Sequence, residues 1–97
     1  MSRSSHPPPD AEFVRASDCV LADIDGSLVM MRVGTGAFCG LDGTAETIVR
    51  ALEKPMRFAD LIDALAARYD GERAQIAADA ADFLAQMVAH KLIARTV

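Results

Sequence analysis

The stretch from Gly34 to Ala45 marks a change of hydrophobic period along the chain. Upstream of it, short apolar runs are separated by turn residues, as in strands; downstream, apolar residues recur at the 3.6-residue spacing of amphipathic helices. Within it, Gly34 and Gly36 bracket Thr35, and glycine accepts positive φ in a turn without steric cost. The stretch therefore predicts a turn, a short strand and the entry to a helix, with strands before it and helices after it.

Two strand-like runs precede this point, Cys19–Ile24 and Ser27–Val33. Asp25-Gly26 lies between them, and this dipeptide is the strongest short-range hairpin signal. Phe38 and Leu41 mark a third strand, so the first half is predicted to be a three-stranded antiparallel meander.

The residues before the meander leave two alternatives open. Ala11–Arg15 either adds an edge segment or forms an irregular lead-in that packs through Phe13. Residues 1–12, which include the Pro7-Pro8-Pro9 run, are predicted to be a flexible tail, with the domain over residues 13–97.

Three helices are predicted in the second half, at residues 44–52, 58–69 and 72–90. Lys54-Pro55 ends the first helix, because the residue before a proline is disfavoured in the helical region. Asp70-Gly71 ends the second. Leu92 and Ile93 are expected to close the chain against the core.

The last helix carries two adjacent apolar stripes. One consists of Ile76, Ala80, Phe83 and Met87, and the other of Ala77, Ala81, Leu84 and Val88. Together they exceed the ~100° arc that a one-sided surface helix buries. Either the helix is wedged deep in the core, or one stripe packs inward while the other lines an open groove.

Composition limits the classes of function. The chain has 97 residues, 52% of them hydrophobic, a formal net charge of −4 and a pI of about 4.9. Nucleic-acid binding normally needs a basic face, so we expect no nucleic-acid partner. No apolar run approaches the ~20 residues of a membrane span, and no secretory signal is visible, so we expect a cytoplasmic protein whose Cys19 and Cys39 are reduced.

No motif predicts catalysis, a cofactor or a metal site. Leu21–Leu28 resembles the nucleophile loop of haloacid-dehalogenase-type phosphatases, but the chain lacks the β-α alternation and the length of that fold. The same acids also make a poor calcium loop, because the flanking helices and the final Glu of an EF-hand are missing. We interpret Asp25-Gly26 as a turn and predict a protein that is not an enzyme.

The ordered set of patterns resembles the PqqD-like family over roughly residues 14–93. The patterns are the Asp25-Gly26 hairpin, the Gly34–Ala45 stretch with Ile48, Leu61-Ile62-x-x-Leu65 before Tyr69-Asp70, and a final helix with Phe83-Leu84 before Lys91-Leu92-Ile93. Two positions depart from the family: Cys39 replaces the second residue of an aromatic pair on the third strand, and Arg57 replaces a Thr that begins the second helix.

The resemblance implies an α+β, winged-helix-like fold in which a three-stranded antiparallel sheet is followed by three helices. It also implies a non-catalytic chaperone for the leader segment of a ribosomally made precursor peptide. In this family the leader adds a strand to the third strand, against the last helix, and is presented to a maturation enzyme such as a leader peptidase or a radical S-adenosylmethionine enzyme.

On this basis two segments are expected to bind the peptide. Ala37, Phe38, Cys39 and Gly40 supply the strand edge, and Ile76, Asp79, Ala80 and Phe83 line the wall of the groove. The alternative is a winged-helix DNA-binding transcriptional regulator, but its recognition helix should be basic, and the last helix carries only Arg73 before Lys91.

Overall fold

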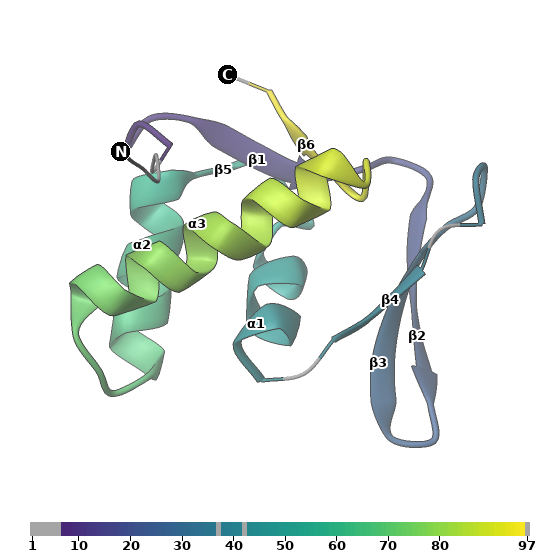
Figure 1. Cartoon of the computed structure of the whole chain (residues 1–97), viewed down its shortest axis with the longest axis horizontal. Coiled ribbons are helices and arrows are strands. Elements are labelled where there is room, and N and C mark those ends of the chain that lie inside the picture. Colours follow the sequence, from purple (N-terminus) through teal and green to yellow (C-terminus); the bar gives the residue numbers. More distant parts are fainter. Residues whose placement is uncertain (1–6, 37, 42, 97) are drawn as a thin grey trace.

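The computed structural model describes residues 7–36, 38–41 and 43–96. In this part of the chain three helices and two three-stranded antiparallel sheets form an α+β fold consistent with a winged-helix-like architecture (Figure 1). The elements in chain order are β1 (Glu12–Arg15), β2 (Cys19–Ile24), β3 (Ser27–Arg32), β4 (Phe38–Leu41), α1 (Gly43–Ala51), β5 (Met56–Arg57), α2 (Phe58–Arg68), α3 (Arg73–Ala89) and β6 (Ile93–Arg95).

The predicted meander is confirmed as a sheet of order β2-β3-β4, which we call sheet B. Its first turn places Asp25 at φ 54° and Gly26 at φ 83°. Positive φ at both central residues matches a type I′ turn, whose twist suits the two strands it joins. In Figure 1 this hairpin projects away from the helices.

A second sheet, which we call sheet A, has the order β5-β1-β6 and was not predicted. The strands-then-helices order therefore holds only for sheet B and the helices. Of the two alternatives for residues 11–15, the strand is correct, and β1 is the central strand of sheet A rather than its edge. Its partners have only two and three residues, which is too short to show a period-two pattern in the sequence.

The division into a tail over residues 1–12 and a domain over residues 13–97 stays a prediction. Within residues 7–12, the Pro9 carbonyl accepts a hydrogen bond from the Ala59 amide at 3.0 Å, and Ala11 is buried.

The helix bounds agree with the predicted ones to within one residue at each end. Their apolar faces meet the inner face of sheet B and the β1 residue Phe13 in one core. Leu92 and Ile93 are both buried, as expected. None of the helices in the described ranges is long and apolar enough to cross a membrane.

Neither stripe of α3 is wholly buried, so neither alternative for this helix holds in its simple form. The buried ridge runs between the two stripes and consists of Ala80, Ala81, Leu84 and Met87. Ile76, Ala77 and Phe83 are partly buried against the core, and Val88 is exposed. The helix therefore has one buried ridge and two flanks outside it.

The hairpin turn gives a direct test of the sheet B geometry. A Cβ at position 26 would meet no atom within 4 Å, so the cost of Gly26→Ala is conformational. We expect a loss of about 1–2 kcal/mol in the free energy of unfolding, from the penalty on left-handed backbone. Gly40→Ala is the matched control, because Gly40 has no such φ and equally open space; equal destabilisation of both variants in urea titrations would contradict the assignment.

Candidate functional site

Strand β4 is an edge strand of sheet B. In the described residues it pairs with β3 alone, in the register Leu28–Leu41 to Met31–Phe38. In an antiparallel ladder, alternate residues direct their N–H and C=O groups to the partner strand, and the others direct them to the open edge. β4 therefore offers main-chain donors and acceptors to an additional strand.

A groove of about 180 Å³ adjoins this edge, and we call it the β4 groove. It is lined by two β4 residues, two from the C-terminal end of α3 and two from the turn that follows the helix: Phe38, Cys39, Gln86, Met87, His90 and Leu92. Phe38 is 73% exposed, although it is a large aromatic side chain. The groove thus joins an open strand edge to a floor formed by the buried side chains of Met87 and Leu92, with the polar Gln86 and His90 beside them.

The C-terminal turn of α3 shapes the floor of the β4 groove. Lys91 adopts φ 63°, its amide donates to the Val88 carbonyl at 3.0 Å, and the Leu92 amide donates to the Met87 carbonyl at 2.9 Å. This is the hydrogen-bond pattern of a Schellman motif, which typically brings the residue after the left-handed position against the last turn of the helix. The motif therefore places Leu92 beside Met87, and both line the groove.

Leu92 is also fixed from the side of sheet B. Its carbonyl accepts hydrogen bonds from the Ala16 amide at 3.1 Å and from the Cys19 thiol at 3.3 Å. Partial burial, and next the charge of Asp18, raise the pKa of the Cys19 thiol, so the thiol keeps its proton and remains a donor at neutral pH. Cys19 and Cys39 are both free thiols.

The structure brings together only some of the predicted site residues. Phe38 and Cys39 line the β4 groove, and Gly40 lies on the same strand without lining it. Ala37 lies outside the described residues. On the helix, Ala80 is only 1% exposed and belongs to the buried ridge.

The other predicted helix residues lie on the flank of α3 that continues into the groove. Ile76 and Phe83 are partly buried against the core. Asp79 is exposed and accepts a hydrogen bond from the Gln75 side-chain amide at 2.9 Å. At helical spacing, the positions three, four and seven residues after Phe83 are groove-lining residues.

Four groove residues were missed from the sequence: Gln86, Met87, His90 and Leu92. Met87 was already a member of the predicted stripe, and extending that stripe by one turn would have included His90. Leu92 could not be predicted, because the left-handed residue that ends α3 is Lys91 and not the usual glycine. The sequence therefore does not indicate that the chain turns back and places Leu92 against the helix.

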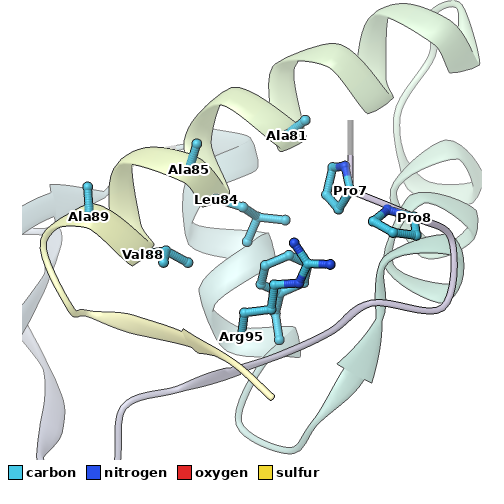
Figure 2. Close-up of a pocket in the computed structure, with 9 residues that line it drawn as sticks. Pro7, Pro8, Ala81, Leu84, Ala85, Val88, Ala89 and Arg95 are labelled. Carbon is cyan, nitrogen blue, oxygen red and sulfur yellow. The ribbon is translucent and has the colours of Figure 1, made fainter. Parts of the chain in front are cut away.

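A second groove lies along the opposite flank of α3, and we call it the β6 groove. Its volume is about 590 Å³, and it is lined by Pro7, Pro8, Phe13, Ala81, Leu84, Ala85, Val88, Ala89 and Arg95. Figure 2 shows Leu84 and Val88 pointing from α3 toward the side chain of Arg95, with Pro7 and Pro8 beside it. α3 thus separates two grooves of different composition.

A family model for "Coenzyme PQQ synthesis protein D (PqqD)" matches residues 27–93 of the chain. The chain belongs to the PqqD family. Every residue that lines the β4 groove lies within the matched segment, whereas Pro7, Pro8, Phe13 and Arg95 of the β6 groove lie outside it. The other five residues that line the β6 groove, all on α3, lie within the matched segment, so the match covers the β4 groove completely and the β6 groove in part.

Two solved structures are similar to this PqqD family member. The first is described as TbiB1 in complex with the TbiA(beta) leader peptide; it is 30% identical, the match covers 82% of this chain and 93% of that one, and the TM-score is 0.73. The second is lasso peptide synthetase B1 complexed with the leader peptide, with 23% identity, coverage of 84% and 96%, and a TM-score of 0.72. The second shows a shared fold. No curated protein matches the chain by sequence.

The left-handed conformation of Lys91 leads to a prediction about the stability of the protein. Lys91→Gly should raise the free energy of unfolding by up to about 1 kcal/mol, because glycine removes the Cβ penalty on left-handed backbone. Lys54→Gly is the control: Lys54 is an exposed lysine that is not among the positive-φ residues, and its replacement should not stabilise the protein. Thermal and urea unfolding measure both, and a destabilised Lys91→Gly would contradict the turn.

Proposed function

We propose that this protein binds the leader segment of a ribosomally made precursor peptide in the β4 groove and presents it to a maturation enzyme. The leader adds a strand to the open edge of β4 and lies along the flank of α3 that carries Phe83, Gln86 and His90. The maturation enzyme is of the leader-peptidase or radical S-adenosylmethionine type. The proposal assigns binding rather than catalysis to the chain and places it in the cytoplasm, with no cofactor.

The open edge of β4 beside a groove with both apolar and polar lining residues is the observation that carries the proposal. Strand addition uses main-chain hydrogen bonds for affinity and pockets for alternate side chains for specificity. The relationship to TbiB1, whose structure contains a leader peptide, supports the same conclusion. The family match supports the β4 side, because it covers the entire lining of that groove.

The geometry indicates which parts of a leader contribute most affinity. Each main-chain hydrogen bond adds only ~0.5–1.5 kcal/mol net, and an unstructured leader loses entropy when it becomes ordered. Side chains of an added strand alternate between the two faces of sheet B. One set enters the β4 groove near Cys39 and Met87, and a groove of about 180 Å³ favours a single aliphatic anchor there.

The DNA-binding alternative is not favoured. On α3, Asp79 and Asp82 are both exposed, and the Asp79 carboxylate is the acceptor for Gln75. A helix that enters the major groove of DNA contacts phosphates, so exposed carboxylates on it oppose binding. No comparison points to DNA.

The first test of the site replaces Phe38. Phe38→Asp should weaken binding of a fluorescein-labelled leader at least ~10-fold in anisotropy titrations, because burying a phenylalanine contributes about 1.5–3 kcal/mol. The probe is the N-terminal segment of a precursor peptide, to be identified as a short reading frame near the gene for this chain. The fold should be retained, because Phe38 is 73% exposed.

Two control variants locate the effect. Val33→Asp changes an apolar residue that is 70% exposed in the turn after β3 and outside the β4 groove, and this variant should bind the leader as the unmodified protein does. Val88→Lys changes the β6 groove and should also have no effect. Loss of binding in Val88→Lys with retention in Phe38→Asp would assign the leader to the β6 groove instead.

A second test uses the thiols. Bound leader should slow alkylation of Cys39 by N-ethylmaleimide, because Cys39 lines the β4 groove. Cys19, whose thiol donates a hydrogen bond to the Leu92 carbonyl, serves as an internal reference. Peptide mass spectrometry reports both sites in one sample. Equal rates for Cys39 with and without saturating leader would exclude the β4 groove as its binding site.

A further inference from the structure

Sheet B has a second face that the proposed function does not use. Side chains alternate between the two faces of a strand, and cross-strand partners share a face. One face contains the buried residues Leu28, Met30 and Leu41 and packs on the core. The other, which we call the outer face, is formed by Val20, Ala22, Ile24, Ser27, Val29, Met31, Phe38 and Gly40.

The outer face carries no charged residue on β2, β3 or β4. Val20, Met31 and Phe38 form one continuous row across the three strands, because Val20 pairs with Met31 and Met31 with Phe38. Val20, Ile24 and Phe38 are 43%, 51% and 73% exposed. The outer face of a half-solvated antiparallel sheet is normally polar, and a contiguous exposed apolar patch marks an interaction surface.

The outer face is continuous with the β4 groove. Phe38 belongs to both, since it lies on the outer face by its register and also lines the groove. A leader strand added to β4 would direct its alternate side chains to the outer face, next to Phe38. The apolar surface would then extend over four strands, one of them from the leader.

The size of the outer face argues against a second copy of this chain as its occupant. Strand spacing and rise give three strands of this length a footprint of roughly 250 Å². A stable interface buries about 800 Å² on each partner. The outer face is therefore the apolar centre of a contact whose remaining area comes from elsewhere, including the leader.

Charged residues at the two ends of sheet B indicate which surface charges a partner should carry. Asp23 and Asp25 are exposed at the hairpin end of sheet B. At the other end Asp18 pairs with Arg32, with 3.0 Å between Oδ2 and Nε. A partner that fits has an uncharged apolar patch with basic residues along the side that meets the hairpin.

We propose that the outer face is the docking surface for the maturation enzyme and that a bound leader completes it. The inference rests on the proposed leader binding. The enzyme contacts Val20, Ile24 and Met31 together with outward side chains of the leader strand, so it binds the loaded protein more tightly than the empty one.

The experiment measures two affinities separately. One probe is the labelled leader described above. The other is the purified maturation enzyme encoded near the precursor gene, and its affinity is measured by biolayer interferometry with and without saturating leader. The unmodified protein should bind the enzyme at least ~10-fold more tightly when the leader is present. Val20→Lys/Ile24→Lys should lose at least ~10-fold of that affinity, while its affinity for the leader stays within about twofold.

Val88→Lys is the matched control, because Val88 is a 36% exposed valine on α3, away from sheet B; it should leave both affinities unchanged. Should the lysine pair fail to fold, Val20→Thr/Ile24→Thr makes the face polar while keeping β-branched side chains. Asp25→Asn removes one negative charge from the hairpin, and asparagine tolerates the left-handed backbone at this position. Association of this variant with the enzyme should be slower at low salt, because it has one carboxylate fewer to attract basic residues of the enzyme.

Enzyme binding that is unchanged in both outer-face pairs would overturn the docking surface, and equal affinity for loaded and empty protein would overturn its completion by the leader. A dimer of the unmodified protein in light scattering that becomes a monomer in the lysine pair would assign the face to self-association. If the leader does not bind at all, the proposed function fails, whereas loss of enzyme binding in the lysine pair without leader would still support the docking surface.

Discussion

The packing of α3 through one buried ridge is the constraint on which the site depends. Ala80, Ala81, Leu84 and Met87 are buried, and the remaining circumference of the helix is at most partly covered. α3 contacts α1 and α2 on its buried side and β6 beyond its C-terminal end. Because both flanks of this ridge stay at least partly exposed, the same helix supplies the wall of a groove on each side, next to β4 and next to β6.

The β4 groove depends on a local strain at the end of this helix. Lys91 adopts a left-handed conformation that costs a residue with a Cβ about 1–2 kcal/mol relative to right-handed backbone. The turn lets Leu92 join the core and the floor of the groove, and hydrogen bonds from Ala16 and Cys19 to its carbonyl connect this floor to sheet B. Leu92 thus links the end of α3 to the start of sheet B.

Sheet B carries apolar side chains on both faces, and this has a physical consequence for function. One face meets the core, so its burial accounts for the fold. The other face gains nothing from folding, and its exposed Val20, Ile24 and Phe38 favour association instead. An edge strand and an uncharged outer face on one small sheet allow two contacts at once, one through the backbone and one through side chains.

The sequence by itself determined the elements with a strong local signal. Asp25-Gly26 predicted the hairpin, helical periodicity predicted all three helices to within a residue, and the ordered motifs identified the family. Sheet A was missed because β5 and β6 are too short for a pattern and pair across long separations through β1.

Only the tertiary structure decided which residues of α3 meet β4. The apolar surface of the helix spans both stripes, so its period could not show that Ala80 is buried, nor that the groove lies at Gln86, Met87 and His90. Both faces of sheet B also carry apolar residues, and the charged Asp23 and Arg32 share the alternation of the core-facing Leu28 and Met30, so alternation alone could not tell the core face from the exposed one. In each case the deciding information is the position of another element, which local sequence does not contain.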